Sequence, residues 1–378
     1  MASDPVLDEI NLTTLKEIFP VVIEDNYFLD TPFQAYLRAR ALVPFGGGAF
    51  MQNTFLYAPM IGGSYAKGAN FNITKRQTLA GTLFDPKYYE VSVPEYKEDI
   101  QVLNKGELAV FSLIDTDLRN AMNTISAIIA IAMSLHGQGA GTNITGNRPN
   151  DVNGWIEALN DGVTPGWEGS IFTAYGTAPR NGVIGSALNS IPIWLGTSGG
   201  ATAPITYQAM EEMYQIASIG REEPDLIPMN KALYAFIKER IQPQQRFAQE
   251  RDPYWGVSGM RFNSAMILKD DYFPSTKFGV NNPDLGNYLA GTFTSPNVAL
   301  PAISNMPQNT LLTVGEVLAM FNTRKWLFRI SDDPEFGFGF SGFVPAQDNT
   351  RVVGQLKAAC NLECTAPRLQ LQAFGAGG

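Results

Sequence analysis

The sequence has little of the chemistry that most enzymes need. Its 378 residues include one histidine, His136, and two cysteines, Cys360 and Cys364. Serine and cysteine nucleophiles usually need a histidine base, and zinc sites need several His, Cys or carboxylate ligands held together. A histidine at the expected end of a helix is better explained as a partner of the helix dipole or as a packed residue. The composition therefore argues against most hydrolytic and zinc-dependent mechanisms.

The two cysteines are close in sequence but are not expected to form a disulfide. In an extended strand the Cα atoms of Cys360 and Cys364 would lie about 13 Å apart, which is too far. In a helix they would lie about 6 Å apart. Because the segment suits a strand better, we expect two buried thiols.

Charge is also scarce. Charged residues make up 17% of the chain, against roughly 25% in a typical soluble domain. The net charge is −9, and the longest basic run is Lys75-Arg76. A dedicated nucleic-acid binder neutralises phosphates with clustered Lys and Arg, so this class is disfavoured. A surface with few charges favours a protein that covers itself with copies of itself.

Targeting and nucleotide-binding signals are missing too. The first residues show no basic segment followed by an apolar one, so no secretory signal is expected. The most apolar stretch, 125–135, is shorter than the ~20 residues that span a bilayer. The chain has no G-x-x-x-x-G-K-[ST] phosphate loop. We therefore expect no membrane partner and no cofactor.

Two acidic pairs are candidates for a metal or acid–base site, and one aromatic stretch is a candidate for base stacking. Neighbouring residues on a strand point to opposite faces, so Asp270/Asp271 and Asp332/Asp333 are interpreted as turns, with a cation at a subunit contact left open. The aromatic residues of 336–343 could stack on bases, but the acidic residues beside them favour packing. We predict no catalytic residue, no cofactor site and no metal site.

The first hundred residues predict two extended segments. Residues 1–48 read as an arm with one short helix after Asn11, kept extended by Pro32 and Pro44. Residues 56–105 read as a two-stranded excursion, with strands at 71–74 and 88–93. A two-stranded ribbon is marginally stable alone. Both segments therefore suggest a partner surface, although the arm could also pack on its own domain.

Residues 107–136 carry the strongest helix signal. Asp115 and Asp117 lie early, where carboxylates favour the dipole, and Gly137 suits the end. A helix of this length would span roughly 30–45 Å. Its expected core-facing stripe consists of Leu118, Met122, Ile125, Ile129 and Met133.

The remaining chain predicts a mixture of helices and strands. Thr206 is an expected N-cap for a helix over 207–219, and a second helix is expected from Met229 to Ile241. Short strands are expected at 224–228, 266–271, 326–330, 336–343 and, at the end, within 352–374.

Several phrases resemble one family when they are taken in order. The sequence Tyr88-Tyr-Glu-Val-Ser-Val, with 97–100 and 104–110, resembles the return limb of an E-loop that runs into a spine helix. Residues 225–234 resemble the connection from a strand to a helix in an A-domain, and 262–274 resemble a later A-domain strand and its turn. Residues 353–368 resemble a common C-terminal segment of capsid proteins. The match covers nearly the whole chain and is to tailed-bacteriophage major capsid proteins with the HK97-like fold.

This resemblance implies an α+β fold. It places an N-terminal arm at 1–48, an extended β E-loop at 49–105, and a spine helix with the start of the P-domain at 106–150. A mixed α/β A-domain would cover most of 151–325, and 326–378 would supply P-domain strands and return to the A-domain. The subunit would form hexamers and pentamers of an icosahedral virion shell around packaged DNA, assembled in the host cytoplasm.

Further partners are implied by the same resemblance. Only about 50 residues precede the excursion and the chain starts with Met1, so we expect a separate scaffolding protein; a portal and a decoration protein are further expected partners. An encapsulin-type nanocompartment shell, or another virion protein of the tail or decoration type, is the alternative.

Charge differs between the two extended segments. Residues 1–40 hold seven acidic and three basic residues, whereas 64–88 hold four basic residues and one acidic residue. We hypothesise that subunit contacts pair these segments. The candidate contact residues are Lys67, Lys75, Arg76 and Lys87 on the basic side and Asp4, Asp8, Glu9, Glu17, Glu24 and Asp25 on the acidic side.

Overall fold

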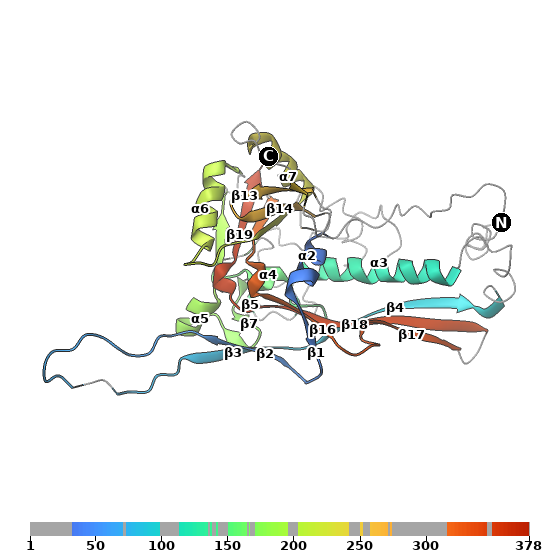
Figure 1. Ribbon diagram of the computed structural model, residues 1–378, viewed down its shortest axis with the longest axis horizontal. Coiled ribbons are helices and arrows are strands. Elements are labelled where there is room, and N and C mark those ends of the chain that lie inside the picture. Colours follow the sequence, from blue (N-terminus) through green and yellow to red (C-terminus); the bar gives the residue numbers. More distant parts are fainter. Residues whose placement is uncertain are drawn as a thin grey trace.

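A computed structural model describes most of the chain. The described residues are 32–70, 73–98, 113–134, 137, 141–142, 150–164, 166, 171–195, 203–241, 250–251, 258–270, 273, 316–345 and 350–377. Within them, two sheets, one long helix and a projecting two-stranded ribbon make up an α+β architecture (Figure 1).

The first sheet has five strands among the described residues. Its order is β1-β16-β18-β17, and β4 pairs with the other edge of β18. The 14-residue strand β18 is the centre, because β16 and β17 share one of its edges. The strands are β1 (Leu42–Phe45), β4 (Lys87–Tyr96), β16 (Trp326–Ser331), β17 (Gly337–Pro345) and β18 (Arg351–Cys364).

The long helix α3 (Leu113–Met133) packs on β4 and β18 of this sheet (Figure 1). Ile125, Ile129 and Met133 are buried, as predicted, and Leu118 is half-buried. The prediction was wrong for Met122, which is 53% exposed. The C-terminal half of the helix is mostly buried, whereas Met122 and Asn123 in the other half are exposed among the described residues.

The second sheet has eight strands among the described residues, in the order β10-β19-β15-β11-β14-β13-β12, with β9 beside β19. Helices α6 and α7 cover a separate apolar core on this sheet. The elements are β9 (Ile191–Trp194), β10 (Ala203–Pro204), α6 (Tyr207–Ala217), β11 (Leu226–Met229), α7 (Lys231–Ile241), β12 (Glu250–Arg251), β13 (Ser258–Phe262), β14 (Ala265–Lys269), β15 (Glu316–Met320) and β19 (Leu371–Gly377).

Both helices and three strands of this second sheet, β11, β14 and β19, follow the sequence signals. The predicted N-cap is confirmed, since the Thr206 hydroxyl accepts a hydrogen bond from the Ala209 amide at 3.1 Å. All four residues of β11 are buried, as expected for a strand between two neighbours, β14 and β15. Cys360 and Cys364 are buried free thiols in β18, which also agrees with expectation.

Residues 32–45 do not form the predicted extended arm. Pro32 begins helix α2 (Pro32–Ala41), because the first helical position needs no amide hydrogen. The Asp270 carboxylate caps this helix by accepting from the Phe33 amide at 2.8 Å. Pro44 lies in β1, an edge strand parallel to β16, where a missing donor is tolerated. The acidic part of the arm, 1–31, lies outside the described residues.

The small elements between α3 and the second sheet are held by a buried arginine. Arg180 is 3% exposed and donates to the backbone carbonyls of Asn160, Leu188, Glu157 and Ala158. Burial lowers the pKa of its guanidinium to about 10, so it stays charged at neutral pH. These elements are α4 (Trp155–Ala158), α5 (Gly182–Leu188), β5 (Gly141–Thr142), β6 (Ile171–Phe172), β7 (Ala174–Tyr175) and β8 (Ala178–Pro179), with 3-10 turns η4 (Thr323–Lys325) and η5 (Pro367–Leu369) in the later chain.

The substitution Arg180→Lys tests this role. An ammonium group has fewer, differently directed donors and leaves buried carbonyls unpaired, so the free energy of unfolding should fall by about 2–3 kcal/mol. Urea unfolding of the full chain measures it. The control Arg119→Lys, at a side chain that is 77% exposed, should change the free energy of unfolding by less than about 0.5 kcal/mol. Equal effects of the two substitutions would contradict the assignment.

Candidate assembly site

A two-stranded ribbon projects from the body of the molecule (Figure 1). It consists of β2 (Met51–Leu56), β3 (Leu79–Phe84) and the segment that connects them; residues 51–84 are called the ribbon below. The strands pair antiparallel from Met51–Phe84 to Leu56–Leu79, and the Tyr57 amide donates to the Thr78 carbonyl at 3.0 Å. Among the described residues, no second layer covers the ribbon beyond its root.

The predicted excursion is present, but one of its strands was misplaced. A strand was expected at 71–74, whereas residues 73–78 are not in a strand and 71–72 lie outside the described residues. The alternation of Phe71 and Ile73 suggested a half-buried strand, yet Ile73 is 93% exposed. The polar Asn53 points inward in β2, which hid that strand from the hydrophobic pattern.

The ribbon exposes an unusual amount of apolar surface. Leu56 is 71% exposed, Met60 is 74% exposed and Tyr65 is 67% exposed. Single exposed apolar residues are common, but such residues collected on one projecting element indicate a surface that another molecule covers. The exposed large apolar residues of the ribbon are Leu56, Met60, Ile61, Tyr65, Ile73 and Leu79.

The charge of the ribbon is of one sign. Residues 51–84 contain Lys67, Lys75 and Arg76 and no acidic residue. All three basic side chains are exposed, so they remain candidates for contacts with an acidic partner. Lys87 does not: it is 6% exposed, in β4 opposite Cys360. The sequence placed Lys87 between two expected strands, whereas it lies within β4. Lys87 is therefore no longer a candidate contact residue.

The six acidic candidates of the arm all lie outside the described residues, so their pairing with the ribbon stays a prediction. They are Asp4, Asp8, Glu9, Glu17, Glu24 and Asp25. His136 also lies outside the described residues.

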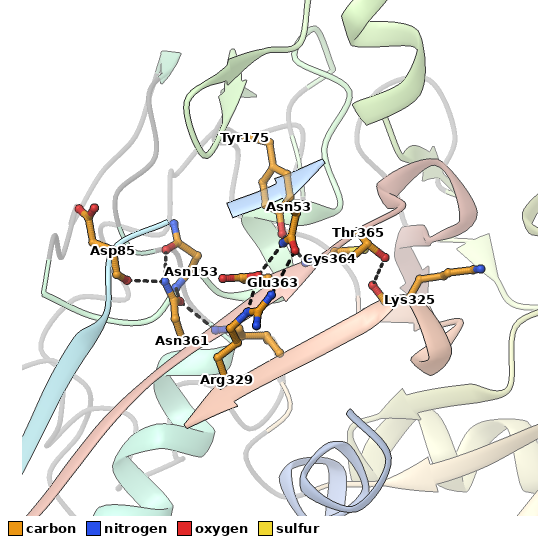
Figure 2. A network of polar contacts seen from close by, with 11 residues as sticks. Asn53, Asp85, Asn153, Tyr175, Lys325, Arg329, Asn361, Glu363, Cys364 and Thr365 are labelled. Carbon is orange, nitrogen blue, oxygen red and sulfur yellow. Dashed lines mark hydrogen bonds and ion pairs between the residues drawn. The ribbon is translucent and has the colours of Figure 1, made fainter. Parts of the chain in front are cut away.

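The root of the ribbon is fixed by a buried polar contact with the five-stranded sheet (Figure 2). Asn53 of β2 donates to the Glu363 carboxylate at 2.5 Å. Arg329 of β16 donates to the same oxygen at 3.2 Å and approaches the Asn53 carbonyl at 3.4 Å. The Glu363 side chain is completely buried and that of Arg329 is 19% exposed. One carboxylate therefore joins three strands.

Asn361 extends this network to the start of β4 (Figure 2). Its amide nitrogen donates to the Asp85 carbonyl at 2.7 Å and to the Asn153 side chain at 3.0 Å. Its amide oxygen accepts from the Asn153 backbone at 3.0 Å. Asn153 in turn donates to Glu157 at 2.8 Å. The side chains of Asn361 and Glu363 share a face of β18, because alternate residues of a strand point the same way.

The hairpin β7–β8 closes the other side of the root. Gly176 between these strands has φ +58, and a side chain there would meet the Leu83 carbonyl of β3 at 2.8 Å, so only glycine allows this approach. The Tyr175 hydroxyl accepts from the Cys364 amide at 2.7 Å. Burial raises the pKa of Tyr175 well above its usual range and that of Cys364 to about 12, so both stay neutral.

The root network was not predicted from the sequence. Asn53, Arg329 and Glu363 are 310 positions apart at the extremes and lie in no shared motif. The one local signal is the polar alternation of Asn361 and Glu363 within the otherwise apolar segment 358–364 of β18, which indicates a polar partner on that face.

The acidic pairs weighed as sites have structural roles. Asp270 caps α2, and Asp333 accepts from the Glu335 and Phe336 amides in a turn, as the turn interpretation predicts. Asp271 lies outside the described residues. The aromatic residues of β17 pack, with Phe340 edge-on to Phe343. Across the described ranges, no three metal-ligating side chains come together, and no helix is long and apolar enough to cross a membrane.

Comparison with known proteins adds the fold. No protein-family model and no curated protein matches the sequence. Among solved structures, the capsid of cyanophage A-1(L) is similar over 96% of this chain and 97% of its own, with 11% identity and a TM-score of 0.63. The capsid of a native GTA particle matches over the full length of both chains, with 10% identity and a TM-score of 0.59.

The holo-SrpI encapsulin complex from Synechococcus elongatus PCC 7942 is also similar. It covers 100% of this chain and 96% of its own, with 8% identity and a TM-score of 0.55. The matches extend over nearly the whole length, so they include the ribbon, the long helix and both sheets. The chain therefore has the HK97-like fold that these capsid and encapsulin structures share.

Proposed function

We propose that this chain is the major capsid protein of a tailed phage. Copies assemble as hexamers and pentamers into an icosahedral shell that encloses packaged double-stranded DNA. The observation that carries the proposal is the ribbon, whose apolar side chains stay exposed in the single chain while its root is held by hydrogen bonds to the five-stranded sheet. Burial of apolar surface stabilises a contact by about 25 cal/mol per Å². A second copy of the chain can bury the apolar surface of the ribbon.

The parts of the fold take their roles from this proposal. The ribbon is the E-loop, α3 with the five-stranded sheet is the P-domain, and the eight-stranded sheet with α6 and α7 is the A-domain. Residues 32–45 belong to the body, so the predicted arm is confined to 1–31, which lie outside the described residues. The protein is a structural component and not an enzyme. Its location is the virion, after assembly in the host cytoplasm with a scaffolding protein, a portal and a decoration protein as partners.

The net charge of −9 supports a wall that does not grip DNA. A shell needs the nucleic acid enclosed and free to leave, so clustered Lys and Arg on the body would be a disadvantage. The encapsulin-type shell is the second candidate, because the encapsulin match is of the same order as the phage matches.

Electron microscopy of the expressed full chain, alone and with a scaffolding partner, tests the function. We expect closed icosahedral shells. Tubes, trimers or dispersed monomers under all conditions would contradict the shell assignment. Particles from the native source separate the two candidates: nuclease-protected DNA in tailed heads supports the phage, and enclosed protein cargo supports the encapsulin.

The apolar surface of the ribbon gives a sharper test. The double variant Leu56→Gln, Met60→Gln should fold normally, because both side chains are exposed, but should lower shell yield at least tenfold. A loss of about 1.4 kcal/mol in a subunit contact is already a factor of ten in its equilibrium constant.

The matched control is Leu56→Met, Met60→Leu, which exchanges the two residues and keeps the apolar surface. Shell yield, measured by sedimentation, should stay near the unsubstituted level. Normal yield of the Gln variant would rule out the ribbon as an assembly surface.

Charge reversal tests the pairing of the ribbon with the arm. The triple variant Lys67→Glu, Lys75→Glu, Arg76→Glu should assemble poorly. Exposed pairs are worth at most about 1 kcal/mol each, and salt screens them, so the defect should appear at low ionic strength.

A compensating variant decides whether the arm is the partner. Reversal of Asp4, Asp8 and Glu9 to Lys should restore assembly of the reversed ribbon and should impair assembly by itself. Light scattering follows both reactions. A reversed ribbon that assembles normally, or that the reversed arm fails to rescue, contradicts the pairing.

A further inference from the structure

The contact at the ribbon root has an unbalanced hydrogen-bond arrangement. Both donors, Asn53 and Arg329, reach the same oxygen of Glu363, Oε2. The other oxygen, Oε1, is buried and has no hydrogen-bond partner among the described residues. A carboxylate that is ionised in this position keeps one oxygen without water and without a donor. A buried charged oxygen without a hydrogen-bond donor is costly. The ionised form of Glu363 is therefore poorly stabilised, although the Arg329 guanidinium lies beside it.

Burial and the cation act in opposite directions on this carboxyl group. Burial raises the pKa of Glu363, while Arg329 and the hydrogen bond from Asn53 lower it, and burial is the larger effect. The protonated acid loses the ion pair, but it keeps an acceptor for Asn53. Arg329 then retains partial access to water and its approach to the Asn53 carbonyl.

Other titratable groups surround the root on every packed element. Tyr175 of β7 and Cys364 of β18 stay neutral, because burial raises the pKa of each. Arg180 stays charged at neutral pH. Lys87 is buried at the start of β4. The remaining carboxyl group is Glu157 of α4, which reaches the network through Asn153. Asp85 contributes its backbone carbonyl.

These contacts make the root sensitive to protons. We propose that Glu363, Arg329 and Asn53 form a proton-controlled latch, which holds the ribbon root closed on the five-stranded sheet when Glu363 is protonated and loosens when Glu363 ionises. The inference goes beyond the proposed function, because it concerns the single chain and does not require a shell.

The direction follows from linkage. In the closed root the pKa of Glu363 is raised above its value in water, so the closed form binds the proton more tightly than an open, hydrated root does. The contribution to the closed state is fully present below the pKa of the hydrated carboxyl. It is lost as the pH rises through the raised pKa of the closed root. Acid therefore closes the latch, and higher pH loosens it.

Distance measurements between spin labels test the latch in the full chain, kept unassembled by dilution. Labels at Thr54→Cys on β2 and Glu90→Cys on β4 report the root, since both positions are exposed. The native cysteines are buried and stay unlabelled. The distance distribution should be narrow at low pH and should broaden reversibly as the pH rises, in one transition.

Three variants assign the transition. Glu363→Gln, a permanent mimic of the neutral acid, should keep the distribution narrow at every pH. Arg329→Gln removes the cation that lowers the pKa, so the midpoint should move to higher pH. The control Glu157→Gln, which removes the buried carboxyl group that accepts from Asn153, should leave the transition in place.

Each opposite result overturns the proposal. A distribution that does not change with pH in the otherwise unsubstituted chain shows that there is no latch. A transition that survives in Glu363→Gln, or that disappears in Glu157→Gln, assigns it to another group. If Glu363→Gln does not fold, the midpoint of Arg329→Gln decides: an unchanged or lower midpoint rejects Glu363 as the titrating group.

Discussion

A two-stranded ribbon cannot bury both of its faces, and this constraint governs the rest of the molecule. Leu56 and Ile73 are exposed and pack on no apolar layer in the described part of the chain, so the ribbon gains little stability from itself. Its direction must be set where it leaves the body. That direction depends on hydrogen bonds at the root, where Asn53 meets the Glu363 carboxylate. Hydrogen bonds suit this task because their energy depends on angle as well as distance.

The ribbon projects from a body that contains two sheets, and several contacts join these sheets. Helix α2 bridges them: Phe33 stacks on Phe321 at 5.3 Å, and Asp270 from the second sheet caps the helix. In addition, β18 of the first sheet is followed by the 3-10 turn η5 and then by β19 of the second sheet. This continuous segment therefore connects the two sheets. Gln370 fixes this crossing by accepting from the Asn322 amide and the Trp326 indole. A rigid frame follows from these few contacts.

The sequence predicts elements whose signals are local and fails where burial depends on distant partners. Thr206 marks a helix start by its own side chain, so α6 could be found. Pro32 suggested extended chain because its capping partner, Asp270, lies 237 positions from Phe33. The alternation that placed a strand at Ile73 does not mark a buried face, because this side chain is 93% exposed. The charge of Lys87 predicts an exposed side chain, and the sequence does not reveal that its neighbour across the sheet is Cys360 of β18.

The chemistry of the root shows why the molecule keeps charge where apolar residues would cost less. A buried ion pair seldom adds net stability over well-packed apolar residues of the same size. Glu363 and Arg329 are therefore not explained by stability. An apolar contact between β2 and the sheet would permit sliding, whereas the hydrogen bonds from Asn53 and Arg329 to one oxygen of Glu363 form in one register only. The root thus exchanges stability for a defined ribbon direction, and the unpaired oxygen of Glu363 makes that direction responsive to protons.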